Sequence, residues 1–152
     1  MFKKAVVGGT FDRMHAGHQK IITTAFGVAR SVAIGLTSDE FANRFRSSQT
    51  TPYGRRKQAV EEYAKTFGKP YNVVEISDSY GVATIDPDID CIIVSEETLL
   101  RAEEINAIRF KKQIPKLTIV VIPILLAQDG GPISSERILK KEIDAGGKLV
   151  RK

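Results

Sequence analysis

Residues 8–20, GGTFDRMHAGHQK, stand directly behind KKAVV (3–7), the first apolar stretch of the chain. They contain both histidines of the 152-residue sequence, His15 and His18. Side chains at positions i and i+3 share one side of a helical turn, so we expect the two imidazoles to lie together at the start of a helix. The two leading glycines permit a sharp turn and the close approach of a ligand to the backbone. The segment therefore predicts a strand, a tight turn and the N-terminus of a helix facing a ligand.

Short apolar segments alternate with helical segments along the rest of the chain. Because the segments of strand length are apolar on both faces, they favour a parallel sheet covered on two sides, a doubly wound, Rossmann-like α/β fold. The length suits one domain, residues 1–152. We predict strands at 3–7, 32–36, 71–76, 91–95 and 117–123, and helices from His18, at 55–68, at 96–112 and at 134–146. Residues 38–54 are expected to form a polar loop with a short helix at its start, and residues 78–90 a loop-rich segment that is helical in part.

In such sheets, ligands bind outside the carboxyl ends of the strands, where the strand order reverses. The opening motif follows the first predicted strand, and a serine-rich turn at ISSERI (133–138) follows the fifth. Both segments are therefore expected at the same edge of the sheet.

Composition narrows the class of protein. With 42% hydrophobic and 27% charged residues, the chain has the make-up of a soluble globular protein. One cysteine excludes an internal disulfide, and neither a signal peptide nor a membrane span is visible, so we expect a cytoplasmic protein. The net charge of +5 suits phosphorylated small molecules. The basic residues show no aromatic interleaving of the kind that single-strand binders use for stacking, so we expect no nucleic-acid partner. A monomer and a homo-oligomer both stay open.

The opening motif carries the chemistry of an anion site. It matches neither the dinucleotide fingerprint nor a Walker A loop. Thr10 offers a hydroxyl, and free amides at the N-terminus of the predicted helix, with the helix dipole, favour an anion beside the two histidines. The alternative of a metal bound by the histidines and Asp12 lacks further ligands at suitable spacing, and we predict no metal site.

The segment ISSERI supports the same chemistry. Ser134 is a natural N-cap, which places Arg137 at the third helical position, where a capping box has Glu or Gln. A cation there opposes the helix dipole unless an anion is bound. We therefore expect a phosphate site; the alternative is an ordinary serine cap with a solvated arginine.

At this point the sequence resembles a known family. GGTFDRMHAGH is similar to the G-T-F-D-x-x-H-x-G-H signature of the nucleotidyltransferase superfamily, and ISSERI to its second signature. Residues 79–109, SYGVATIDPDIDCIIVSEETLLRAEEINAIR, and IGLTSDEF (34–41) resemble archaeal-type phosphopantetheine adenylyltransferases and the matching domain of eukaryotic CoA synthase. The resemblance covers nearly the whole chain. It implies a reaction of ATP, as its Mg²⁺ complex, with 4′-phosphopantetheine to give dephospho-CoA and pyrophosphate.

The resemblance also implies roles for individual residues. His18 would stabilise the α-phosphoryl group during transfer, and Thr10 would hold the attacking phosphate. The implied ATP site contains Gly9, Thr10, Phe11, His15, Gly17, His18, Ser95, Thr98, Ser134, Ser135 and Arg137. The implied acceptor site contains Thr10, Gly81, Val82, Ala83 and Arg109.

Two features depart from the bacterial relatives. Their catalytic lysine after the second strand has no counterpart, because no lysine occurs between Lys20 and Lys57. Arg44 or Arg46 could supply that cation, and we assign it to Arg44. Their arginine-rich turn after the fourth strand is replaced by VSEET, and Arg109 either restores positive charge or is a solvated helix residue.

Two other functions stay open. A nucleotidyltransferase acting on another phosphorylated small molecule would share both signatures. A non-catalytic nucleotide-binding protein would not require intact Thr10, His15 and His18.

Overall fold

Five parallel strands form one sheet in the order β3-β2-β1-β4-β5, which confirms the predicted α/β fold. The computed structural model describes residues 1–44, 46 and 49–151. The strand order reverses between β1 and β4, so ligands are expected at the carboxyl ends of these two strands. The strands are β1 (Phe2–Gly9), β2 (Ala29–Thr37), β3 (Tyr71–Ile76), β4 (Cys91–Ser95) and β5 (Thr118–Ile122).

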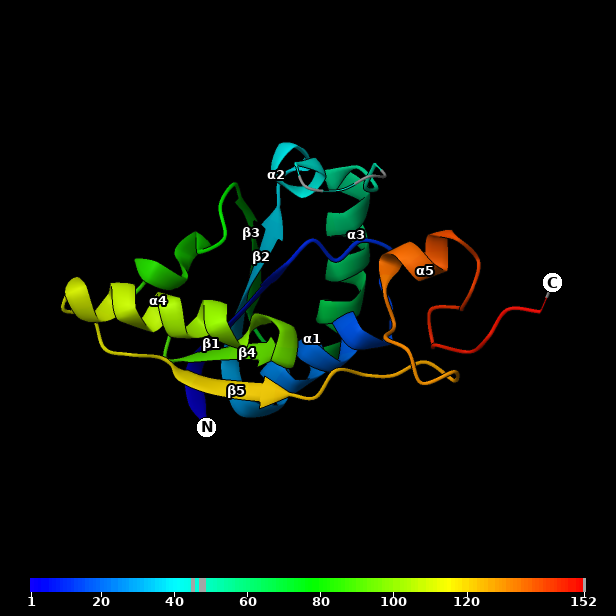
Figure 1. The fold of residues 1–152 in the computed structure, drawn as a ribbon. Helices are drawn as coiled ribbons and strands as arrows, with labels where there is room; N and C mark the ends of the chain where they lie inside the picture. The colour runs from blue at the N-terminus through cyan, green and yellow to red at the C-terminus, as the bar shows by residue number, and fades with distance from the viewer. Residues whose placement is uncertain (45, 47–48, 152) are drawn as a thin grey trace.

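Helices cover both faces of the sheet. In Figure 1, α4 lies on one side of the strands, and α1 and α3 lie on the other. None of the helices in the described ranges is long and apolar enough to cross a membrane. The α-helices are α1 (Ala16–Val28), α2 (Asp39–Asn43), α3 (Tyr53–Ala64), α4 (Leu99–Lys111) and α5 (Ser135–Leu139), and the 3-10 turns are Lys65–Phe67, Gly81–Thr84 and Glu96–Thr98.

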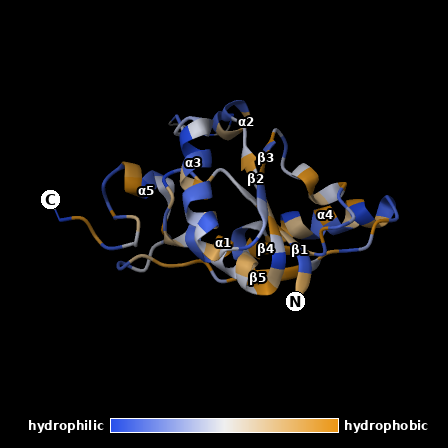
Figure 2. Ribbon diagram, turned by 180° about the vertical axis from the view of Figure 1, so that it is seen from behind, coloured by the Kyte–Doolittle hydropathy of each residue, from blue (hydrophilic) through white to orange (hydrophobic). Residues whose placement is uncertain are grey.

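The alternation of side chains along each strand divides the core into two clusters. Ala5 and Val7 of β1 pack with residues of α1 and α3, whereas Val6 between them packs with residues of α4. Strands buried on both faces need apolar residues at successive positions, as the sequence predicts. Figure 2 shows this as hydrophobic colour along β4 and β5, while α3 is largely hydrophilic.

The chain differs from the prediction mainly after the fifth strand. The helix expected at 134–146 ends at Leu139. Lys141 takes a left-handed backbone with φ of 60°, and the chain turns back so that Ile143, 1% exposed, pairs with Leu149 in an isolated β-bridge. Burial of Ile143 thus outweighs the helical pattern. Of the polar loop predicted at 38–54, residues 45, 47 and 48 lie outside the described ones; its first part forms α2, as expected.

The expectation that Arg109 contacts the acceptor, or is solvated, is wrong. Arg109 faces the core side of α4 and has no exposed surface. Its guanidinium donates hydrogen bonds of 2.7–3.1 Å to the carbonyl oxygens of Pro115, Ala83, Asp86 and Ile89. These bonds hold the turn after β3 against α4, so Arg109 shapes a wall of the ligand edge without reaching it.

We expect Arg109→Met to lower the free energy of unfolding by about 3 kcal/mol or more, because several buried carbonyls would lose their donor. Urea unfolding followed by circular dichroism measures this. Lys111→Met, at an exposed position of the same helix, is the control and should change stability by less than about 0.5 kcal/mol. Equal stability of the two variants would contradict the role given to Arg109.

Candidate active site

A cavity of about 710 Å³ lies at the carboxyl ends of all five strands. This volume is within the range of small-molecule sites, roughly 300–1,000 Å³. The cavity brings together most residues of the expected site but not Phe11, Arg44, Arg109 or Arg137. The expected residues that line it are Gly9, Thr10, His15, Gly17, His18, Gly81, Val82, Ala83, Ser95, Thr98, Ser134 and Ser135.

The two histidines cap helix α1 for each other. His15 Nδ1 accepts hydrogen bonds from the amides of Gly17, at 3.0 Å, and His18, at 3.4 Å. His18 Nδ1 in turn accepts from the amide of His15, at 3.3 Å. The rings are stacked with their centroids 3.6 Å apart. Because each Nδ1 is an acceptor, the proton of each neutral imidazole is on Nε2, which leaves one donor per ring for a ligand.

This cap corrects one expectation about the anion site. The first amides of α1 are not free, because those of Gly17 and His18 bond to His15, and that of Ala16 donates to the carbonyl oxygen of Ala145, at 2.9 Å. An anion at this turn would therefore bind the imidazole Nε2–H groups rather than backbone amides. The donors available to an anion here are therefore the imidazoles of His15 and His18 and not the first amides of α1.

Both imidazoles are neutral near pH 7. Burial lowers the pKa of His15 from its ordinary value of 6.5 to about 4. Burial, followed by the neighbouring His15, lowers the pKa of His18 to about 3. Protonation would also convert each Nδ1 from an acceptor to a donor facing an amide. The pair thus offers hydrogen-bond donors without carrying charge.

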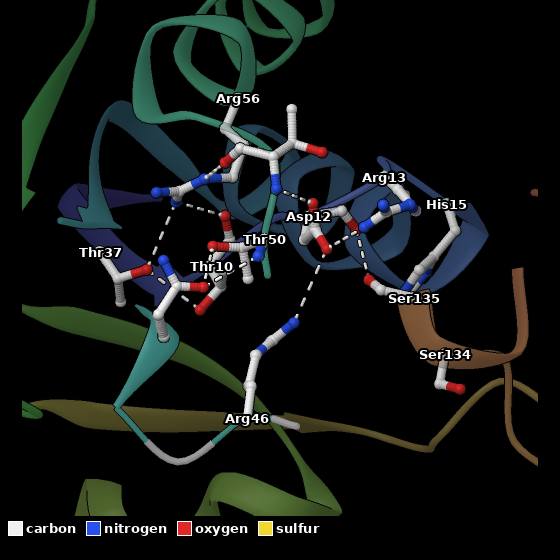
Figure 3. Close-up of polar contacts among 12 residues, drawn as sticks. Thr10, Asp12, Arg13, His15, Thr37, Arg46, Thr50, Arg56, Ser134 and Ser135 are labelled. Atoms are coloured by element: carbon white, nitrogen blue, oxygen red, sulfur yellow. Dashed lines mark hydrogen bonds and ion pairs between the residues drawn. The ribbon is translucent and has the colours of Figure 1, made fainter. Parts of the chain in front are cut away.

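Thr10 lies at the turn after β1 and is linked to two buried residues (Figure 3). The hydroxyl of Thr37, at the end of β2, donates to the Thr10 hydroxyl at 3.0 Å. Arg56 of α3 donates to the Thr10 carbonyl oxygen at 2.9 Å and to the Thr37 hydroxyl at 3.4 Å. Thr10 is thereby fixed from both its backbone and its side chain.

Asp12 forms ion pairs with two arginines of the site. Its carboxylate, 3% exposed, forms ion pairs with Arg13 and with Arg46, the latter at 3.7 Å (Figure 3). Burial alone would raise the pKa of Asp12, but hydrogen bonds from Thr51 and the charges of the two arginines hold that pKa below its ordinary value. Asp12 is therefore ionised and balances part of the positive charge at the cavity.

The cation assigned to Arg44 is better placed on Arg46. Arg46 lines the cavity, whereas Arg44 does not. The guanidinium carbon of Arg44 lies 5.8 Å from the centre of the Phe41 ring. Phe11 is also absent from the lining, because its side chain is 2% exposed and belongs to the core cluster beneath α1.

The serine turn lines the cavity, whereas Arg137 is not among the lining residues. Ser134 caps α5 by accepting from the Arg137 amide at 3.2 Å, and the Ser135 hydroxyl donates to the carbonyl oxygen of Asp12. The guanidinium of Arg137 pairs with the carboxylates of Asp129 and Glu142. Its charge near the helix N-terminus is thus balanced by acidic side chains, and the expectation that it requires a bound anion is wrong.

Comparison with known proteins shows the family of this chain. The family model described as cytidylyltransferase-like matches residues 6–141. The phosphopantetheine adenylyltransferase of Methanosarcina mazei is 45% identical over 97% of each chain. That of Methanothermobacter thermautotrophicus is 40% identical over 99% of this chain and 92% of its own. The chain belongs to the phosphopantetheine adenylyltransferases of the cytidylyltransferase-like family.

Solved structures extend the comparison to the fold. A protein of unknown function from Archaeoglobus fulgidus has a TM-score of 0.70 and 32% identity, over 86% of this chain and 99% of its own. A pantoate-beta-alanine ligase from Francisella tularensis, at 14% identity and a TM-score of 0.58, covers 91% of this chain and 65% of its own and shares the fold alone.

Several residues at the cavity have no role predicted from the sequence. Thr37, Arg13 and Arg101 line it, and Arg56 supports it from behind. Thr37 is the last residue of its strand, so its place at the carboxyl edge is a signal that the sequence offered. No signal in the sequence distinguishes Arg56 from the other basic residues of the segment RRKQAVEEYAK (55–65).

We expect Gly17→Ala to impair catalysis, because an added Cβ would lie 2.9 Å from Cε1 and 3.1 Å from Nδ1 of His15. The imidazole would have to move and give up its caps, at a cost of about 1 kcal/mol in stability. Steady-state kinetics and urea unfolding measure both effects. Gly27→Ala, in the same helix with nothing within 4 Å of its added Cβ, is the control. It should keep full activity and gain about 0.5–1 kcal/mol in stability.

The histidine pKa values predict a pH-dependent stability. As the pH falls below 6.5, the unfolded chain takes up protons that the folded histidines, with pKa values of about 4 and about 3, do not. The free energy of unfolding should therefore fall between pH 6.5 and 5, by up to about 1.4 kcal/mol per pH unit for each histidine. NMR titration of the imidazole Cε1 protons checks the same values. An ordinary pKa near 6.5 for both rings would contradict the cap.

Proposed function

We propose that this protein transfers the adenylyl group of ATP to 4′-phosphopantetheine, giving dephospho-CoA and pyrophosphate. The observation that carries the proposal is the placement of two neutral imidazoles and the Thr10 hydroxyl around one cavity. Relatives that bear the name of this activity, 37–45% identical over almost the entire chain, support the choice of acceptor.

The reaction needs positioning more than acid–base chemistry. A phosphate oxygen of the acceptor attacks the α-phosphorus of ATP in line and forms a new phosphoanhydride bond. The bond from the α-phosphorus to the bridging oxygen of the β-phosphate breaks, and pyrophosphate leaves with that electron pair. The attacking phosphate is already ionised near neutral pH, so no general base is required. The protein has to align both reactants and donate to the oxygens on which charge builds up.

His18 is suited to the α-phosphoryl oxygens. Its Nε2–H is a fixed donor, because Nδ1 is bonded to the backbone of His15. A donor held in place before the reaction stabilises developing charge without reorganisation. Thr10, on the turn next to it, would hold the attacking phosphate between the two substrates.

The remaining cavity residues divide between the substrates. In this proposal His15, Gly17, Ser95, Thr98, Ser134 and Ser135 contact ATP, which enters as its Mg²⁺ complex. The 3-10 turn Gly81–Thr84 lies along the acceptor through its first three residues. Arg46, together with Arg13, supplies the positive charge that bacterial relatives obtain from a lysine. We further propose that residues 1–152 act as one nucleotidyltransferase domain, since both core clusters share one sheet. A cytoplasmic location is proposed as well, because a single cysteine fits a reducing compartment.

The test is release of pyrophosphate from ATP with a panel of acceptors. We expect turnover with 4′-phosphopantetheine, and a loss of about 100-fold or more in kcat for His18→Ala with near-normal folding, as for removal of a transition-state donor. Gln19→Ala, the exposed neighbour in α1, is the control and should keep full activity.

Two outcomes would contradict the proposal. Turnover with nicotinamide mononucleotide or glycerol 3-phosphate, but not with phosphopantetheine, would reject the acceptor while keeping the transferase. Undiminished kcat in His18→Ala would remove His18 from the mechanism.

A further inference from the structure

Arg56 is a buried cation that does not line the cavity. It is 1% exposed, and its guanidinium lies behind the turn that carries Thr10 (Figure 3). In addition to the Thr10 carbonyl and the Thr37 hydroxyl, it donates to the carbonyl oxygen of Thr51 at 2.7 Å and to the Asp39 carboxylate at 2.9 Å. A residue buried and bonded in this way is held in one orientation.

Arg56 determines the direction of the neighbouring hydrogen bonds. A guanidinium has no acceptor, so the Thr37 oxygen must accept in its contact with Arg56. The Thr37 hydroxyl, 5% exposed, has one other partner among the described residues, the hydroxyl of Thr10 at 3.0 Å. With the Thr37 oxygen accepting from Arg56, the acceptor for the Thr37 proton among the described residues is the Thr10 hydroxyl. Thr37 therefore donates to Thr10.

This direction has a consequence for the cavity. The Thr10 oxygen is occupied as an acceptor on its buried side, toward Thr37. No acceptor for its own proton lies among the described residues, so this proton can point into the cavity that Thr10 lines. Such a hydroxyl presents a donor, the polarity that an anionic phosphate oxygen requires.

We propose that Arg56 and Thr37 are positioning residues that orient the Thr10 hydroxyl as a hydrogen-bond donor toward the acceptor phosphate. The chain of donors runs from Arg56 to Thr37 and from Thr37 to Thr10. The inference rests on the proposed function, because that function places the acceptor phosphate at Thr10. Neither Arg56 nor Thr37 touches the reacting atoms in this scheme.

The acid partner of Arg56 keeps the arrangement rigid. Asp39 accepts from Arg56 and also from the amide of Tyr53, at 2.9 Å, in the first turn of α3. The guanidinium thus joins α2 and α3 to the ends of β1 and β2.

The first experiment removes the Thr37 hydroxyl and keeps its shape. For Thr37→Val we expect kcat/KM for 4′-phosphopantetheine to fall about tenfold, the scale of one oriented hydrogen bond, with the KM for ATP unchanged. Thr37→Ser restores the hydroxyl and should restore kcat/KM. The control is Thr50→Val, because Thr50 is also 5% exposed and its hydroxyl bonds to Asn43 rather than to Thr10. Should Thr37→Val not fold, Thr37→Ala removes the same hydroxyl.

A double-mutant cycle separates positioning from general support. If Thr37 acts through the Thr10 hydroxyl, then Thr37→Val should add no further loss of kcat/KM in a Thr10→Val background. A merely structural contribution would persist there and multiply the two losses.

The outcomes for the function and for this inference differ. Turnover of phosphopantetheine by the unmodified protein supports the proposed function. If Thr37→Val then keeps full activity, or if the losses multiply in the double variant, the positioning role is overturned and the proposed function stays intact. If the unmodified protein neither turns over nor binds phosphopantetheine, both the proposed function and the positioning role are overturned. A tenfold loss rescued by serine and absent in the Thr10→Val background supports the inference.

Discussion

The reciprocal cap between His15 and His18 is the interaction on which the site depends. It ends the turn after β1, starts helix α1 and assigns the proton of each ring to Nε2. Gly17 is part of the same constraint, because the stacked ring of His15 occupies the space of a side chain there. Local structure and chemistry are therefore one feature. The bonds that satisfy the backbone at the start of the helix also leave two uncharged donors at the cavity.

Two buried arginines extend this order to the walls of the cavity. Arg56 reaches from α3 to the turn that carries Thr10, and Arg109 reaches from α4 to the turn Gly81–Thr84. Burial of an unpaired charge costs much free energy, but both guanidiniums donate to carbonyl or hydroxyl oxygens, and Arg56 also pairs with the Asp39 carboxylate. One arginine acts on each face of the sheet. The cavity between them is built from short loops whose positions these helices fix.

The sequence predicts the helices and strands of this structure well, because they follow from the spacing at which apolar residues recur. Strand Tyr71–Ile76 and strand Cys91–Ser95 have the expected bounds, and the two motifs meet at the carboxyl edge as the topology requires. The failures have a common cause, since the sequence does not show which groups a helical arginine meets, and both arginines were assigned to ligands. Arg109 and Arg137 were misplaced because their partners, carbonyls and carboxylates outside their own elements, are set by tertiary packing. Ile143 likewise lies in an isolated β-bridge with Leu149 rather than in the helix that its spacing predicts.

The charge balance of the cavity fits a transferase better than a high-affinity anion trap. Arg13 and Arg46 lie at the site but share the Asp12 carboxylate, and the two imidazoles are neutral. A cavity of free cations would bind ATP, acceptor and pyrophosphate with similar strength, and such uniform binding does not raise kcat. Neutral donors of fixed direction act most strongly where charge increases during the reaction, on the oxygens of the transferred group. In the proposed reaction, a phosphate that binds Arg13 or Arg46 would compete with the Asp12 carboxylate, so part of the gain in binding would be offset by the ion pair that is lost.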